Sequence, residues 1–203
     1  MKSYNVAILG ATGAVGQQML QCLAEQDFPV NNLKLFASAR SAGKIAQFKG
    51  EDVVIEEARD EAFDGVDIVL GAAENDIAKQ FVPVAREKGA VTVDNSSAYR
   101  LDPDVPLIIP EVNPEDVAKH NGIIANPNCA TIIGLVAVNP LHKLGGIKRM
   151  VVSTYQAASG AGVGGLRELE AQMARISAGE KVEDPKAFAY QLACNLIPQI
   201  GGF

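Results

Sequence analysis

The chain has 203 residues, of which 48% are hydrophobic and 21% charged, and its formal net charge is -6. This composition is ordinary for a globular protein and allows one large domain or two small ones. Nucleic-acid binders and membrane-surface binders need a basic face, so the acidic balance argues against both kinds of partner. No apolar run is long enough to span a bilayer, and no long apolar signal core precedes the first predicted strand.

The three cysteines, Cys22, Cys129 and Cys194, are widely spaced, and an odd number cannot all pair. Without a disulfide framework we expect a reducing, cytoplasmic environment, and the sequence indicates no metal site. Most cysteines of this kind are small buried apolar side chains. Cys22, in the apolar body of a predicted helix, and Cys194 fit that interpretation. Cys129 fits it less well, because its neighbours are polar and turn-forming.

The segment Tyr4–Leu9 (YNVAIL) predicts a short strand, which the glycine-rich turn GATGAVG and a helical pattern follow. In such a strand-turn-helix, backbone amides and the positive end of the helix dipole bind a pyrophosphate. Gly10 and Gly13 permit the tight turn and the close approach, and Gly16 lets the helix pack on the strand. The context predicts a dinucleotide site, with a plain tight turn as the alternative.

The segment Leu33–Ala37 (LKLFA) predicts the second strand, and the loop SARSAG follows it. An NAD-selective site places a carboxylate at the end of this strand for the ribose 2′-hydroxyl. This chain offers Ser38, Arg40 and Ser41 instead, and a guanidinium with two hydroxyls suits a 2′-phosphate. We therefore predict NADP as the cofactor; the alternative is that Arg40 is only a solvated loop charge.

Strand and helix patterns continue to alternate in the middle of the chain. Val66–Leu70 and Ala90–Val93 predict strands, and Asp76–Lys88 predicts a helix that Pro83 kinks or divides. This alternation predicts an α/β fold. We expect a Rossmann-like, mostly parallel sheet with helices on both faces.

The segment DNSSAYR follows the strand Ala90–Val93, at the edge where ligands bind in such sheets. Asn95 is a small polar group at that edge, and Arg100 adds a cationic fork suited to a phosphate or carboxylate. From these residues alone, a polar turn with an ion-paired arginine is an equally good interpretation.

Cys129 lies in NPNCATI, between a predicted strand, Ile123–Ala125, and a predicted helix, Ile132–Leu144. At a helix N-terminus the dipole favours the thiolate, which is the nucleophilic form. Asn128 is suited to cap the helix or to turn its amide toward the site. A cysteine nucleophile with a dinucleotide site predicts attack on an aldehyde or activated acyl group. Hydride then passes to or from the nicotinamide by way of a thioester.

The segment Lys148–Tyr155 predicts a further strand, which runs into QAASGAGVGG. Gln156 is suited to hold a substrate carboxylate or carbonyl by its amide, and Ser159 and Gly160 let the backbone approach a cofactor closely. A flexible connector is the alternative. Val163–Ile176 then predicts an amphipathic helix whose apolar stripe packs into the core.

Five motifs, GATGAVG, SARSAG, NSSAYR, NPNCATI and STYQAASGAG, occur in this order and resemble bacterial aspartate-β-semialdehyde dehydrogenase. The resemblance runs from the first strand to the end of the chain. It implies NADPH-dependent reductive dephosphorylation of L-aspartyl 4-phosphate to L-aspartate 4-semialdehyde, for lysine (through diaminopimelate), threonine, methionine and isoleucine biosynthesis.

Three alternatives remain beside that family. N-acetyl-γ-glutamyl-phosphate reductase runs the same chemistry on a similar scaffold, although NPNCATI and SSAYR favour the aspartate enzyme. A non-catalytic NADP-binding module is a second alternative, but such a module has no use for NPNC or STYQAASGAG. A relative of glyceraldehyde-3-phosphate dehydrogenase is disfavoured by the NADP-type second strand and by the different cysteine motif.

The resemblance implies roles for individual positions. Cys129 looks like the nucleophile that forms the acyl-enzyme, Gln156 orients the substrate, Arg100 contributes to the phosphate site, and Asn128 supports catalysis. Asn95 lies where the nicotinamide is expected. The implied cofactor contacts are Gly10, Thr12, Gly13, Ala14, Val15, Ser38, Arg40, Ser41, Asn95, Ser159 and Gly160.

The family's proteins are considerably longer than this chain. The resemblance therefore implies an NADP-binding domain over residues 1–128, followed by an incomplete α+β catalytic and dimerisation domain over residues 129–203. The family's general acid/base is a histidine in the part that this chain lacks, and we interpret His120 and His142 as structural or solvated. We expect a truncated copy of a homodimer or dimer of dimers, which binds NADP weakly and turns over slowly or not at all.

Overall fold

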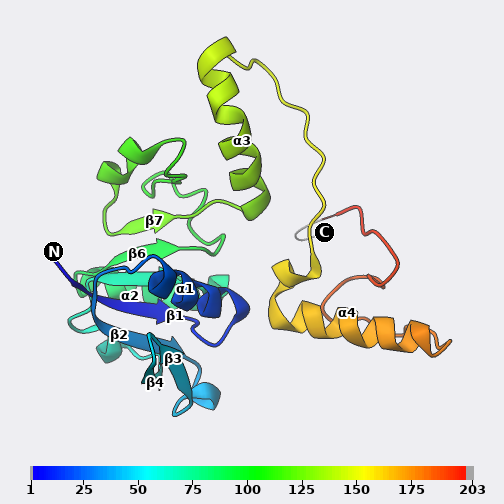
Figure 1. Cartoon of the computed structure of the whole chain (residues 1–203), viewed down its shortest axis with the longest axis horizontal. Coiled ribbons are helices and arrows are strands. Elements are labelled where there is room, and N and C mark those ends of the chain that lie inside the picture. Colours follow the sequence, from blue (N-terminus) through cyan, green and yellow to red (C-terminus); the bar gives the residue numbers. More distant parts are fainter. Residues whose placement is uncertain (1, 200–203) are drawn as a thin grey trace. The chain divides into compact units, whose positions relative to one another are not determined.

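The structure is a computed structural model, and it describes residues 2–199; the end of the predicted second domain, residues 200–203, lies outside them. The chain divides into two compact units, Met1–Val152 and Ser153–Phe203. The first unit contains a seven-stranded sheet (Figure 1). Its strands, in sheet order, are β3 (Ile45–Phe48), β4 (Glu51–Glu57), β2 (Val30–Ala37), β1 (Tyr4–Leu9), β5 (Ile68–Gly71), β6 (Val91–Asp94) and β7 (Ile123–Ala125).

Four α-helices and four short 3-10 helices accompany the sheet in the described residues. The α-helices are α1 (Ala14–Glu25), α2 (Asn75–Glu87), α3 (Cys129–Gly145) and α4 (Gly162–Ser177). The 3-10 helices are Ala39–Ser41, Asp60–Phe63, Pro114–Lys119 and Ala158–Ala161. None of the described helices is both long and apolar enough to cross a membrane. Helix α2 continues through Pro83, so this residue does not divide it.

All neighbouring strands of the sheet are parallel except β3 and β4, which pair antiparallel. The predicted mostly parallel sheet is therefore confirmed, although the β3–β4 hairpin was not predicted. Its two-residue turn consists of Lys49 and Gly50, whose φ angles are 50° and 87°. Positive φ at both turn residues matches the right-handed twist of the flanking strands.

The hydrophobic core lies on both faces of the sheet. In β1, Val6 and Ile8 pack with Leu20 of α1, whereas Ala7 and Leu9 belong to the cluster that contains Phe81 and Ala85 of α2. Successive side chains of a strand point to opposite faces, so α1 and α2 cover opposite faces of the sheet (Figure 1). This arrangement confirms the expected Rossmann-like architecture.

The strand predicted over Lys148–Tyr155 is absent, and the prediction was wrong. This segment has no regular secondary structure, and Val151 and Tyr155 are 84% and 83% exposed. A β-strand forms only where a neighbour satisfies its backbone N–H and C=O groups. No described segment pairs with these residues, so they do not form a strand despite their high strand propensity.

Helix α4 belongs to the second unit and is built differently from the prediction. Its bounds agree closely with the expected helix, but Leu166 and Met173 of the apolar stripe are exposed, so the prediction of core packing was wrong. The buried side chain is Gln172, whose Oε1 accepts hydrogen bonds from the backbone N–H groups of Leu192 and Ala193. The helix thus holds the following segment through a polar side chain.

Candidate active site

One edge of the sheet gathers most of the site residues predicted in the first unit. The strands β1, β2, β6 and β7 run in the same direction, so their carboxyl ends lie at one edge (Figure 1). Gly10 follows β1, Ser38 follows β2, Asn95 follows β6, and Asn126 follows β7. This strand-end edge is the place where open α/β sheets bind their ligands.

The glycine turn after β1 is joined directly to the end of β2. The backbone N–H groups of Gly10 and Ala11 donate to the carbonyl oxygen of Phe36 at 2.9 and 3.0 Å. Phe36 is two residues before Ser38, where the predicted 2′-phosphate loop begins. The two predicted halves of the cofactor site are therefore adjacent.

The glycines of this turn allow backbone to pack against backbone. Gly10 has a φ of 89°, and a Cβ at this position would lie 2.9 Å from the backbone of Ala72. A Cβ on Gly16 would lie 2.3 Å from the carbonyl oxygen of Gly10. Both distances are shorter than real Cβ contacts, so the structure requires glycine at these two positions.

Helix α1 begins with its first amides available to a ligand. Its N-cap is Gly13, which has no side chain to cap the helix, and the first turn contains no acidic residue. The first N–H groups of a helix have no intrahelical acceptor, so those of Ala14 and Val15 face the turn as donors. Such donors, with the positive end of the helix dipole, fit the pyrophosphate of a dinucleotide.

The loop after β2 exposes two of its three predicted contacts. Ser38 and Arg40 are exposed, whereas Ser41 is only 8% exposed and its N–H donates to the carbonyl oxygen of Ser38. Within residues 2–199, Arg40 forms no ion pair with a carboxylate. The guanidinium therefore has its full charge available for an incoming anion.

Arg100 joins the loops that follow β6 and β7. Its Nε donates to the carbonyl oxygen of Asn126 and its Nη2 donates to that of Asn95, both at 2.9 Å. Arg100 forms no ion pair with a carboxylate within residues 2–199, so the alternative interpretation of an ion-paired arginine is wrong. Asn126 also donates from its Nδ2 to the Oδ1 of Asn95 at 2.6 Å. We did not predict a role for Asn126, although it is the first residue of the NPNC motif.

A buried carboxylate lies beside this network. Asp94 is fully buried, and its carboxylate accepts hydrogen bonds from the hydroxyl and the backbone N–H of Ser96 at 2.6 and 3.3 Å. Burial raises the pKa of Asp94, while the bonds from Ser96 and the charge of Arg100 act in the opposite direction. Asp94 therefore shapes the loop that carries Asn95, a role that the sequence did not reveal.

Cys129 is the first residue of α3, as predicted, and it is exposed. Asn128 is the N-cap, and its Oδ1 accepts hydrogen bonds from the N–H groups of Ala130 and Thr131 at 3.0 and 3.4 Å. This cap confirms one of the two roles expected for Asn128. The sulfur therefore lies at the positive end of the dipole of a capped helix.

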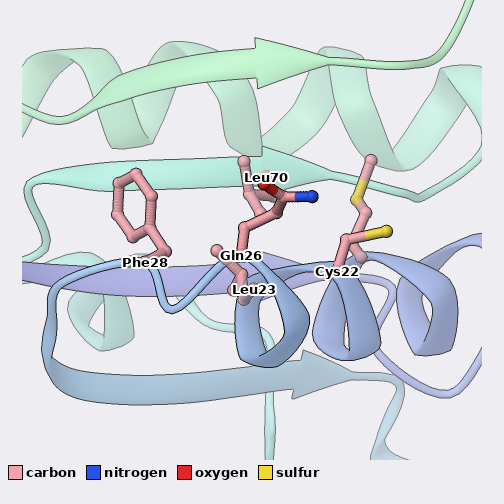
Figure 2. A pocket seen from close by; sticks show the side chains of 6 residues that line it. Cys22, Leu23, Gln26, Phe28 and Leu70 are labelled. Atoms are coloured by element: carbon pink, nitrogen blue, oxygen red, sulfur yellow. The ribbon is translucent and has the colours of Figure 1, made fainter.

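The other two cysteines are also exposed, so the prediction that Cys22 and Cys194 are buried was wrong. Cys22 lines an apolar hollow of about 200 Å³ between α1 and β5 (Figure 2). The hollow is also lined by Met19, Leu23, Gln26, Phe28 and Leu70. It lies beside the second half of α1, away from the glycine turn, and is not part of the strand-end edge.

Both histidines use a ring nitrogen for a structural hydrogen bond. The Nδ1 atom of His120 accepts from the backbone N–H of Gly122, and that of His142 accepts from the N–H of Ile147, both at 3.0 Å. These contacts agree with the interpretation of both histidines as structural side chains.

The remaining predicted site residues lie in the second unit. Gln156 is half-buried, and Ser159 and Gly160 are exposed in the 3-10 helix Ala158–Ala161. Their approach to Cys129 and to the cofactor stays a prediction. The predicted domain boundary after Asn128 also stays a prediction. The two compact units of the structure divide at a different place, after Val152.

Comparison with known proteins identifies the family. Residues 5–120 match the family described as "Semialdehyde dehydrogenase, NAD binding domain", and residues 138–203 match "Semialdehyde dehydrogenase, dimerisation domain". The aspartate-semialdehyde dehydrogenase of Aquifex aeolicus is 48% identical over 203 residues, which cover 98% of this chain and 60% of that protein. The chain thus spans about 60% of the length of the curated relatives it matches.

Solved structures show the same similarity. The crystal structure of aspartate semialdehyde dehydrogenase II from Vibrio cholerae, complexed with ASA, superposes with a TM-score of 0.95 at 45% identity. It matches all of this chain over 61% of its own length. The enzyme of Candida albicans, crystallised with NADP, has a TM-score of 0.59 at 29% identity over 71% of this chain and 48% of its own length. The sequence motifs, the glycine turn and the family match together show that this chain belongs to the semialdehyde dehydrogenase family and has its NAD(P)-binding fold.

Proposed function

We propose that this chain carries the cofactor site and the nucleophile of an aspartate-semialdehyde dehydrogenase. The observation that carries the proposal is the position of Cys129, at the capped start of α3, on the sheet edge that also bears the glycine turn. The names of the relatives support L-aspartate 4-semialdehyde as the aldehyde of the reaction, and the resemblance of the sequence motifs implies L-aspartyl 4-phosphate as the acyl substrate. The pathway is amino-acid biosynthesis, by way of diaminopimelate for lysine.

The thiolate of Cys129 attacks the acyl carbon of the substrate, the bond from that carbon to the phosphate oxygen breaks, and phosphate leaves. This step produces a thioester on Cys129. Arg100, whose guanidinium lies at the same edge, attracts the phosphate, and Gln156 orients the substrate. Bound NADPH supplies the hydride that reduces the thioester carbon. Expulsion of the Cys129 thiolate then releases the aldehyde and restores the starting nucleophile.

NADP rather than NAD is the proposed cofactor. Ser38 and Arg40 are exposed after β2, and Arg40 has no carboxylate partner in the described part of the chain. The NADP in the Candida albicans structure supports the same choice. We expect Arg40→Ala to weaken NADPH binding strongly and NADH binding little, with the exposed Arg149→Ala as the matched control. If Arg40→Ala weakened the binding of NADPH and NADH equally, Arg40 would not contact the 2′-phosphate.

The reaction is tested with L-aspartate 4-semialdehyde, NADP and phosphate, and NADPH absorbance is followed for the wild-type chain and Cys129→Ala. We expect slow or no turnover, because both histidines are engaged in structural bonds. Activity that Cys129→Ala loses would support the dehydrogenase, and a higher rate with N-acetyl-glutamate semialdehyde would favour the acetylglutamyl-phosphate reductase. A folded, NADPH-binding chain that is silent with both substrates agrees with this expectation, and the reactivity of Cys129 then separates an enzyme fragment from a non-catalytic module.

The nucleophile has a test that needs no turnover. All three cysteines are exposed, so access alone does not distinguish them. We expect iodoacetamide to alkylate Cys129 fastest at neutral pH, because only this thiol begins a capped helix. Peptide mass spectrometry measures the three rates in one sample. Equal rates at Cys129, Cys22 and Cys194 would contradict the assignment.

We also propose a cytoplasmic homodimer, or dimer of dimers, as the assembly. The match of residues 138–203 to a dimerisation domain supports self-association. Sedimentation of the purified chain checks this, and a monomer at micromolar concentration would contradict it.

A further inference from the structure

The loops that follow β6 and β7 are held together by side chains as well as by the sheet. Asn126 donates from its backbone N–H to the carbonyl oxygen of Asp94 at 2.8 Å, which extends the parallel ladder one residue beyond β7. The guanidinium of Arg100 bonds the carbonyl oxygens of Asn95 and Asn126. The backbones of Asn95 and Asn126 are therefore held next to each other independently of their side chains.

The side chains of these two asparagines are also bonded, and the bond has a direction. Asn126 donates from Nδ2 to the Oδ1 atom of Asn95 at 2.6 Å, in a half-buried position. An asparagine amide has one acceptor oxygen and one donor nitrogen. Because Asn126 occupies the oxygen of Asn95, the Nδ2 group of Asn95 points the other way. Within residues 2–199 this Nδ2 group makes no hydrogen bond.

We propose that Asn126 is a positioning residue that orients the Asn95 amide, so that Asn95 donates from Nδ2 to the carboxamide oxygen of the nicotinamide. The inference rests on the proposed function, because a dinucleotide with its 2′-phosphate at the loop after β2 and its pyrophosphate at the glycine turn extends its nicotinamide toward β5 and β6. The same bonds hold the start of the Cys129 loop, since Asn126 is three residues before the nucleophile. One amide thus couples the position of the hydride donor to the position of the thiol.

Two ligands separate this role from a merely structural one. NADPH carries the nicotinamide, whereas 2′-phospho-ADP-ribose has the same pyrophosphate, adenosine and 2′-phosphate without it. Asn126→Asp replaces the donor by an acceptor, which draws the Nδ2 group of Asn95 away from the cofactor. We expect NADPH to bind about fivefold to twentyfold more weakly to this variant, with the affinity for 2′-phospho-ADP-ribose unchanged.

The experiment is isothermal titration calorimetry of both ligands with the wild-type chain, Asn126→Asp and Asn126→Ala, after circular dichroism has verified folding. Asn31→Asp is the matched control, because Asn31 Nδ2 donates to Asn5 Oδ1 at 2.9 Å in an exposed amide pair at the opposite edge of the sheet. We expect the control to bind both ligands as the wild type does.

Each result is decisive. If both Asn126 variants bind NADPH more weakly but bind 2′-phospho-ADP-ribose as the wild type does, the positioning role is supported. Unchanged NADPH binding, or equal weakening of both ligands, overturns it and leaves the proposed function intact. A wild-type chain that binds the two ligands equally also overturns it, because the nicotinamide then makes no contact. A wild-type chain that binds neither ligand refutes the proposed cofactor, and the positioning role with it.

Discussion

Replacing Gly16 with alanine tests whether the cofactor turn depends on backbone packing. The new Cβ would lie 2.3 Å from the carbonyl oxygen of Gly10 and 2.8 Å from the Cα of Ala11. The first distance is more than 1 Å shorter than the 3.4 Å at which ordinary contact begins. Both neighbours are backbone atoms, so no side-chain rotation relieves the clash, and the start of α1 must move away from β1.

Two effects of opposite sign decide the magnitude. Overpacking a close-packed site costs about 1–3 kcal/mol, while alanine in place of glycine inside a helix contributes about 1 kcal/mol of stability. The backbone contacts place the steric cost at the upper end, so we expect a net loss of about 2 kcal/mol. For a chain of this length that loss lowers the Tm by about 4–8 °C.

The control is Gly134→Ala, inside α3, where a Cβ meets nothing within 4 Å. This variant has the same change in helix propensity without the clash, so we expect it to match or exceed the wild-type Tm. Thermal unfolding and NADPH titration measure both variants. If Gly16→Ala melts no lower than the wild type and binds NADPH equally well, the close packing of the turn is irrelevant and the reasoning is refuted.

Three further substitutions test the strand-end edge. Thr92 is buried with no hydrogen-bond partner for Oγ1 among the described residues, so Thr92→Val should raise the free energy of unfolding by about 1 kcal/mol. Urea unfolding checks this, and a loss of stability would reveal a missing partner. Asn128→Ala removes the cap of α3 and should cost about 1 kcal/mol in the same assay. Burial raises the pKa of Asp94 above 3.8, so its contribution to stability is present below that pH and is lost as the pH rises through the folded-state pKa. Asp94→Asn should therefore gain stability relative to the wild type as the pH rises above 3.8, and a difference that does not vary with pH would contradict this.

Local patterns predicted the elements that build the cofactor site. The strand Tyr4–Leu9, the glycine turn and the cap at Asn128 each depend on a few consecutive residues. The β3–β4 hairpin escaped prediction because its turn is Lys-Gly, which lacks the asparagine or aspartate typical of such turns. The strand expected over Lys148–Tyr155 failed for the opposite reason, since strand propensity does not supply a pairing partner.

Predicting which side chains of a helix are buried requires the angular position of each residue around the helix axis as well as the local composition. Leu20 and Leu23 of α1 face the sheet, and a helix turns about 100° per residue. Cys22 is one residue before Leu23, about 100° away around the helix, so its thiol lies at the flank of the helix and not in the core. The bond from Asn126 to Asn95 joins residues that are 31 positions apart, and it depends on the register of β6 and β7. No sequence motif encodes such a register directly.

The loops of the strand-end edge act as one unit because the parallel ladder continues past the strands. Gly10 bonds to the end of β2, Asn95 to the end of β5, and Asn126 to the end of β6, each through a backbone N–H. The glycine turn, the Asn95 loop and the Cys129 loop therefore each begin at an amide that the neighbouring strand holds. The cofactor turn and the Cys129 loop lie on different strands, yet the continuous ladder between β2 and β7 holds both in one frame. In the proposed complex, the register of the sheet therefore sets the distance from the hydride donor to the thiol, and the side-chain bond between Asn126 and Asn95 refines it.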